Sequence, residues 1–175
     1  MKILILGNAG AGKTTLAAQL MRQGNIARLS LDEVAFGAGA QRRPLADSVA
    51  EALRFVGRHP QWIVEGCYAD IIEPLLAHCE ALLFLNPGVA TCIAHCRQRP
   101  WEPEKFASRQ EQDAQLAPLL AWVAEYESRA DEYGLRQHQR VFEGFNGRKR
   151  ELRRPPVDAA GLLAELGLEG ADHGA

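Results

Sequence analysis

The sequence has no apolar run long enough to cross a membrane and no excess of charge of either sign. Its uninterrupted apolar runs, such as Ala81 to Leu85, are far shorter than the roughly 20 residues of a membrane-spanning helix. The apolar stretch that starts after Lys2 ends at Gly7, which is too short for the core of a signal peptide. A formal net charge of −2 argues against a protein that binds nucleic acid or membranes through its overall charge. We therefore expect a cytoplasmic protein with no membrane attachment.

Cysteine is scarce, and the four cysteines include no C-x-x-C pair of the kind that binds structural zinc. Cys92, His95 and Cys96 share one turn of an expected helix, but that helix is rich in Ala, Val and Ile. We expect free thiols that pack as small hydrophobic residues. Internal repeats and low-complexity segments are also lacking, and a chain of 175 residues fits one domain with one core.

Short apolar runs alternate with helical stretches, which is the pattern of an α/β protein with a parallel sheet. We expect strands at residues 2–6, 26–30, 62–65, 81–86 and 140–145. Helices are expected near residues 13–23, 46–58, 69–78, 88–98 and 158–166, with a longer stretch over 103–133 that Pro118 breaks or kinks. Nearly continuous apolar strands need helices on both faces, so we predict a three-layer α/β/α sandwich.

Residues 7–14 match the phosphate-binding pattern G-x-x-x-x-G-K-[ST] in full, between an apolar strand and a good helix. Glycines let such a loop wrap tightly, so that backbone N–H groups and the helix N-terminus face phosphate oxygens. The predicted ATP-binding residues are Gly7, Asn8, Ala9, Gly10, Ala11, Gly12, Lys13, Thr14 and Thr15. Lys13 is expected to reach the β- and γ-phosphates during catalysis, and the Thr14 hydroxyl to bind Mg²⁺.

Two acidic residues, Asp32 and Glu65, come at the ends of the second and third expected strands. Both are expected at the sheet edge that carries the phosphate loop. We predict that Asp32 is a general base or positions the substrate, the alternative being a turn or a helix cap. We predict that Glu65 binds Mg²⁺ together with Thr14, the alternative being an ion pair with an arginine.

Basic residues gather in two segments. Arg97, Arg99 and Arg109 lie in residues 97–109, and we predict that they place positive charge around the γ-phosphate, a solvated surface being the alternative for each. A second basic string, residues 148–154, follows the last expected strand. The loop after that strand approaches the nucleotide base in this architecture, so Asn146 and Arg148 are predicted to line the adenine. The string lacks the interleaved aromatic residues of a single-strand nucleic-acid site.

Two further observations narrow the class of protein. There is no N-K-x-D string to read guanine, and the short spacing between strands suits a small phosphotransferase. Trp122, Tyr126 and Tyr133 fall at helix-like spacing, so we interpret them as core residues that pack against the sheet and not as a platform for base stacking.

Residues 7–14, Leu31-Asp32-Glu33 and Trp62-Ile63-Val64-Glu65-Gly66-Cys67-Tyr68 together resemble the adenylate-kinase-related small P-loop kinases. The likeness is greatest to the branch of DNA-topology-modulation proteins, with the pattern W-[IV]-[IV]-[DE]-G-x-Y. The resemblance covers roughly residues 1–150 and implies a five-stranded parallel sheet of order 2-3-1-4-5, a mobile lid and MgATP as phosphoryl donor. Adenylate kinases have Asp-Gly-Phe-Pro-Arg after the third strand, and shikimate kinases have a triple glycine there. Neither acceptor site therefore transfers to this sequence.

The sequence thus predicts a P-loop kinase-like domain in residues 1–155, with a substrate loop at 32–44 and a lid at 97–109. A short helix and a flexible tail are expected in residues 156–175. The predicted reaction transfers the γ-phosphoryl group of MgATP to a small acceptor that bears a hydroxyl or a phosphate. The alternative is a nucleotide-dependent regulatory or nucleic-acid-binding ATPase without a small-molecule acceptor. We expect a monomer or a weak homodimer.

Overall fold

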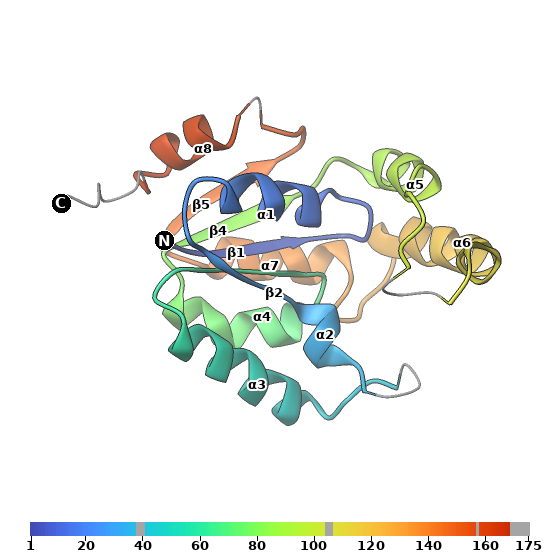
Figure 1. Ribbon diagram of the computed structural model, residues 1–175, viewed down its shortest axis with the longest axis horizontal. Helices are drawn as coiled ribbons and strands as arrows, with labels where there is room; N and C mark the ends of the chain where they lie inside the picture. The colour runs from blue at the N-terminus through green and yellow to red at the C-terminus, as the bar shows by residue number, and fades with distance from the viewer. Residues whose placement is uncertain (38–40, 104–106, 157, 169–175) are drawn as a thin grey trace.

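The computed structural model describes residues 1–37, 41–103, 107–156 and 158–168 (Figure 1). These residues form one parallel sheet of five strands in the order β2-β3-β1-β4-β5, which confirms the expected topology. The strands are β1 (Lys2–Gly7), β2 (Ala27–Ser30), β3 (Trp62–Gly66), β4 (Ala81–Leu85) and β5 (Arg148–Leu152). The carboxyl ends of all five strands therefore lie at one edge of the sheet.

Helices cover both faces of the sheet. They are α1 (Lys13–Met21), α2 (Leu31–Ala35), α3 (Leu45–Arg58), α4 (Ala69–Leu75), α5 (Val89–Arg97), α6 (Arg109–Ala124), α7 (Leu135–Gly144) and α8 (Ala159–Glu165), with 3₁₀ turns η2 (Leu76–His78) and η3 (Glu125–Glu127). Figure 1 shows α1 and α8 on one side of the sheet and α3, α4 and α7 on the other. The three-layer α/β/α sandwich is confirmed.

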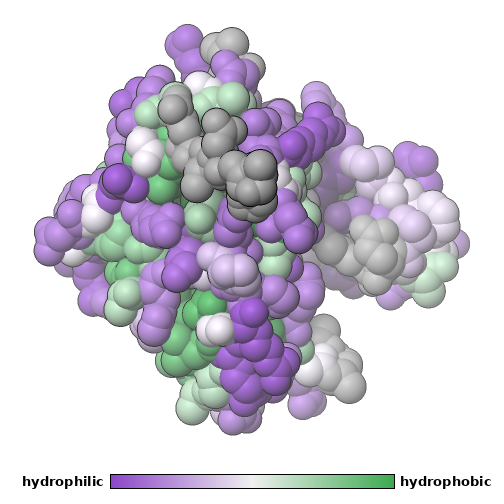
Figure 2. Space-filling model, turned by 60° about the vertical axis from the view of Figure 1, so that its left-hand side comes forward, coloured by the Kyte–Doolittle hydropathy of each residue, from purple (hydrophilic) through white to green (hydrophobic). Residues whose placement is uncertain are grey.

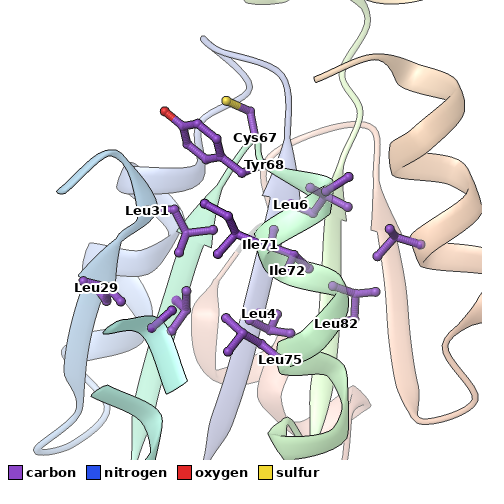
Figure 3. Close-up of a cluster of buried hydrophobic side chains, with 14 of the residues drawn as sticks. Leu4, Leu6, Leu29, Leu31, Cys67, Tyr68, Ile71, Ile72, Leu75 and Leu82 are labelled. Atoms are coloured by element: carbon purple, nitrogen blue, oxygen red, sulfur yellow. The ribbon is translucent and has the colours of Figure 1, made fainter. Parts of the chain in front are cut away.

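The strands bury alternate side chains in two separate clusters. Leu4, Leu6 and Leu82 pack with α4 in one cluster, part of which is drawn in Figure 3. Ile3 and Ile5 pack in the other cluster, together with residues of α1, α5 and α8. Burial on both faces explains why β1 consists almost entirely of large apolar residues.

The fifth strand was expected in the wrong place. Residues 140–144 end helix α7, where Val141 packs into the core and Arg140 faces solvent. The true strand is β5, whose sequence Arg-Lys-Arg-Glu-Leu shows no apolar run. A strand at the edge of a sheet, paired here only with β4, is not buried on both faces and so lacks the apolar pattern of a central strand. Its basic side chains also hinder pairing with another chain.

Two further expectations need correction. The long helical stretch expected over residues 103–133 is shorter: α6 runs from Arg109 to Ala124, continues unbroken through the exposed Pro118, and is followed by η3. The expected substrate loop, residues 32–44, begins as a helix, since Ser30 and Glu33 form a capping box that starts α2. Parts of this loop (38–40), of the expected lid (104–106) and of the tail (169–175) lie outside the described residues.

The C-terminal helix α8 packs against α1, and its Leu162 and Leu163 join the same cluster as Leu16 and Leu20. Figure 2 shows the molecule turned so that this end comes forward. Hydrophilic side chains cover most of that face, with small hydrophobic patches between them. None of the helices in the described residues is long and apolar enough to span a membrane.

A buried histidine of α7 supports the turn that follows β3. His138 Nε2 lies 2.9 Å from the Cys67 carbonyl oxygen, and Nδ1 lies 2.7 Å from the Tyr126 hydroxyl oxygen. A carbonyl oxygen only accepts, so Nε2 carries the hydrogen and Nδ1 accepts from the tyrosine. Burial lowers the pKa of His138 to about 4, and the ring is neutral at physiological pH.

We predict that this neutral histidine makes the fold less stable in acid. The unfolded chain takes up a proton near the ordinary pKa of 6.5, whereas the folded ring resists protonation down to about 4. The free energy of unfolding should therefore fall by about 3 kcal/mol as pH drops through that window. Urea titrations at a series of pH values measure the slope. His138→Gln should reduce it and His78→Gln, at an exposed position, should not; equal slopes in all three proteins would contradict the prediction.

Candidate functional site

A cavity of about 850 Å³ opens at the carboxyl edge of the sheet. Its walls come from the phosphate loop between β1 and α1, from the segments after β2, β3, β4 and β5, and from the ends of α5 and α6. Ligands bind at this edge in open α/β sheets. Residues that are far apart in the sequence, such as Lys13, Tyr68 and Arg154, therefore line one space.

Two glycines shape the phosphate loop. Gly10 has a φ of +78° and Gly12 a φ of +94°, in the left-handed region that L side chains rarely adopt. A Cβ atom at Gly10 would lie 2.3 Å from the carbonyl oxygen of Cys92 in α5. The loop thus lies directly against α5 and ends where α1 begins, at Lys13, so that the N-terminus of α1 faces the cavity.

Polar contacts fix the phosphate loop to its surroundings. The Asn8 amide nitrogen donates to the Val123 carbonyl of α6 at 3.2 Å, and its oxygen accepts the Ala9 N–H at 2.8 Å. His95 Nδ1 lies 2.8 Å from the Gly10 carbonyl oxygen and donates to it. The loop is therefore connected to both helices that flank the expected lid.

Lys13, Thr14 and Glu65 meet at the mouth of the loop. Lys13 Nζ donates to the Asn8 carbonyl at 2.9 Å, and the Thr14 hydroxyl donates to Glu65 Oε1 at 3.2 Å. Arg28 also pairs with Glu65 Oε1, at 2.6 Å. Both interpretations of Glu65 thus describe part of its environment: it contacts Thr14, and it is ion-paired with an arginine. The guanidinium compensates a carboxylate that is only 3% exposed.

The oxygens of Thr14 and Glu65 are of the type that Mg²⁺ prefers, and they are close enough to act on one ion. These two residues therefore fit the metal that the phosphate loop implies. The described residues contain no group of three or more His, Cys, Asp or Glu side chains that could hold a metal ion. The turn with Cys92, His95 and Cys96 is therefore not such a group.

Asp32 lies in the first turn of α2 and lines the cavity with its side chain exposed. It is not the helix cap, because Ser30 occupies that position. The Tyr68 hydroxyl donates to Asp32 Oδ1 at 2.5 Å. Burial raises the pKa of Tyr68 strongly, and the nearby Cys67 and Asp32 raise it further, so the phenol keeps its proton and acts as the donor. Asp32 is thus positioned by a fixed hydrogen bond beside open space.

The structure brings one of the three predicted catalytic arginines to the cavity. Arg99 is half-buried and lines it, whereas Arg97 and Arg109 are exposed and are not lining residues. Arg154, after β5, also lines the cavity and was missed by the sequence analysis. Within the described residues, neither Arg99 nor Arg154 takes part in an ion pair, so both are available to an anionic ligand.

Asn146 and Arg148 do not lie where an adenine site was expected. They come before or at the start of β5, at the amino edge of the sheet, and are not cavity-lining residues. The sequence analysis expected the fifth strand at residues 140–145 and therefore expected Asn146 and Arg148 to follow it. Because the strand is β5 (Arg148–Leu152), these residues precede or begin it. Residues that do follow β5 and line the cavity are Arg154, Pro155 and Pro156. The Pro-Pro pair after a basic string was the available signal for the end of a strand.

Four aromatic side chains also line the cavity: Phe36, Tyr68, Trp122 and Tyr133. The interpretation as core residues is confirmed for Tyr126, which is buried and bonded to His138. Trp122 and Tyr133 are half-buried, and they pack on the core while also facing the cavity. Figure 3 shows Tyr68 and Cys67 at one end of the buried cluster, beyond Leu31 and Ile71. Burial raises the pKa of the Cys67 thiol to about 12, which disfavours a nucleophilic role.

No family model matches the chain. A segment of 73 residues is 34% identical to an adenylate kinase of Methylobacterium nodulans, and it represents 42% of this chain and 37% of that protein. The fold is similar to a deoxyadenosine kinase from M. mycoides solved with bound dATP (TM-score 0.50, 12% identity, 95% of this chain and 100% of that chain). It is also similar to a shikimate kinase from Acinetobacter baumannii solved with shikimate (TM-score 0.52, 14% identity, 95% and 90%). The chain therefore has the fold of small P-loop kinases.

Proposed function

We propose that this protein is an ATP-dependent phosphotransferase that moves the γ-phosphoryl group of MgATP to a hydroxyl of a small molecule. One observation carries the proposal: the phosphate loop and Asp32 line the same cavity. A hydrolase that acts on ATP alone would not need a second binding region beside the phosphate loop, such as the one lined by Asp32, Phe36 and Tyr68. The partial likeness to an adenylate kinase and the kinase fold support the same reaction class.

The phosphate-loop side of the cavity supplies the charges for a triphosphate. The loop amides and the N-terminus of α1 would bind phosphate oxygens, and Lys13 would exchange its contact with the Asn8 carbonyl for one with the β- and γ-phosphates. Arg99 adds a cation from the end of α5. Thr14 and Glu65 would hold Mg²⁺, which when bound offsets the negative charge on the phosphates.

Asp32 would accept the proton of the attacking hydroxyl. A bond forms between the acceptor oxygen and the γ-phosphorus, while the bond from that phosphorus to the β–γ bridging oxygen breaks. ADP leaves with the electron pair of the broken bond, and the hydroxyl proton passes to the Asp32 carboxylate. Tyr68 keeps the carboxylate in place by its hydrogen bond to Oδ1.

The alternative, a nucleotide-dependent regulatory or nucleic-acid-binding ATPase, rested on the missing acceptor signature and on the basic string of residues 148–154. Three of the basic side chains in that string form hydrogen bonds or ion pairs within the protein. Lys149 donates to the carbonyls of Phe142, Glu143 and Phe145, Arg150 pairs with Glu165, and Arg153 pairs with Glu151. This weakens the case for a continuous phosphate-binding surface there. The cytoplasmic location, the monomeric or weakly dimeric state, the domain boundaries and the DNA-topology-modulation resemblance stay predictions.

Lys13→Ala should weaken MgATP binding at least about tenfold, because it removes a charged hydrogen-bond donor from the phosphates. Isothermal titration calorimetry measures the affinity. Lys2→Ala is the matched control, since Lys2 begins β1 at the opposite edge of the sheet. Undiminished binding by the Lys13 variant would contradict the assignment of the phosphate loop.

Asp32→Asn should lower phosphoryl transfer by about 10²–10⁴-fold and leave MgATP affinity nearly unchanged, because only the proton acceptor is lost. The readout is transfer from labelled ATP to a panel of nucleosides, sugars, hydroxy acids, nucleotides and nucleic-acid ends. Asp47→Asn is the matched control, since Asp47 also lies exposed in the first turn of a helix. Equal losses in both variants would remove Asp32 from the reaction.

A further inference from the structure

The lysine and arginine side chains that line the cavity come from one side of it, where the acid Glu102 is also a lining residue. These lysine and arginine residues, in the described part of the chain, are Lys13, Arg99 and Arg154. They come from the junction of the phosphate loop with α1, from the segment after α5 and from the segment after β5. On the side formed by β2, β3 and their following segments, the lining residues that carry charge are the acids Asp32 and Glu65. We assign these cations to the phosphates of the donor. Among the described residues, the segments after β2 and β3 contribute no lysine or arginine to the cavity lining.

Four aromatic rings line the cavity: Phe36 after β2, Tyr68 after β3, Trp122 in α6 and Tyr133 just before α7. The ring centroids of Phe36 and Tyr68 lie 6.2 Å apart, those of Tyr68 and Tyr133 5.3 Å apart, and those of Tyr133 and Trp122 5.5 Å apart. The rings meet edge to face, so each helps to hold the next in place. We call these four residues the aromatic wall. Phe36 is its most accessible member, at 38% exposed.

Two arginines support the aromatic wall but cannot serve as anion receptors. The Arg42 guanidinium lies 4.9 Å from the centre of the Tyr68 ring and pairs with Asp70 at 3.0 Å. The Arg129 guanidinium lies 4.3 Å from the centre of the Trp122 ring and pairs with Glu125 at 3.1 Å. Neither arginine is a cavity-lining residue. Each guanidinium is ion-paired and faces a ring of the wall instead of the cavity, so we assign both to holding the rings in place.

These features select the chemical class of the acceptor. A phosphate or carboxylate on an acceptor held at Asp32 would lie beside that carboxylate, and no lysine or arginine from the described segments after β2 and β3 lines the cavity there to offset the repulsion between like charges. A flat ring, by contrast, stacks favourably on aromatic side chains whatever its hydrogen-bonding groups. We propose that the acceptor is a neutral, flat-ringed alcohol of the nucleoside class, with its ring on the aromatic wall and its hydroxyl at Asp32. This inference rests on the proposed function, because it assigns the second substrate of that reaction.

Binding can be tested apart from transfer. With the donor side saturated by Mg²⁺ and a non-hydrolysable ATP analogue, calorimetry compares four ribonucleosides, their 5′-monophosphates and free ribose. At least one nucleoside should bind tenfold or more tightly than both its monophosphate and ribose. Phe36→Ala should weaken that binding about tenfold while the affinity for the ATP analogue stays unchanged, and Phe36→Tyr should restore it. A monophosphate that binds as tightly as its nucleoside, or a Phe36→Ala protein that binds like wild type, would overturn the inference.

A parallel transfer assay with labelled ATP separates the two proposals. Preferential phosphorylation of a monophosphate, or of a sugar that has no flat ring, would overturn the acceptor class and leave the kinase function intact. Nucleoside binding that depends on Phe36 but gives no phosphorylated product would instead overturn the kinase function and support the ligand class of the aromatic wall. Transfer to a nucleoside, lost on removal of the Phe36 ring, supports both.

Discussion

The close packing of the phosphate loop against α5 is the constraint on which the site depends. Gly10 leaves no room for a side chain between the loop and Cys92, and His95 donates to the Gly10 carbonyl. Asn8 ties the same loop to α6. The loop cannot shift without moving both helices, so Arg99, which follows α5, keeps a defined position relative to the phosphates. A rigid donor site of this kind stabilises developing charge without reorganisation during the reaction.

The second half of the cavity is built on the turn after β3. That turn carries Cys67 and Tyr68, and His138 supports it through the Cys67 carbonyl. Tyr68 connects the two roles of this side, because its ring belongs to the aromatic wall and its hydroxyl binds Asp32. A single side chain thus positions the proposed proton acceptor and part of the surface for the acceptor ring. Phe36 and Tyr68 follow β2 and β3, and they join Trp122 of α6 and Tyr133, which precedes α7, to form the aromatic wall.

The phosphate loop and the sheet could be predicted from the sequence because their signals are local: a glycine pattern of eight residues, and apolar runs in strands buried on both faces. The edge strand β5 could not, since its exposed basic residues resemble a surface loop. That error displaced the expected adenine contacts to Asn146 and Arg148. The aromatic wall was also beyond reach, because Phe36 and Tyr133 meet through Tyr68 only after the chain has folded. Short-range spacing makes Tyr133 look like an ordinary core residue.

Phosphorus NMR of the wild-type protein with MgATP and a mixture of nucleosides tests the central claim most directly, that the phosphate loop and Asp32 serve one transfer reaction. The spectrum distinguishes the possible fates of the γ-phosphoryl group in a single sample. We predict that a phosphomonoester resonance grows as the γ-phosphate signal of ATP declines, and that ADP accumulates in equal amount. Release of inorganic phosphate alone, at the same rate with and without the nucleosides, would contradict the account.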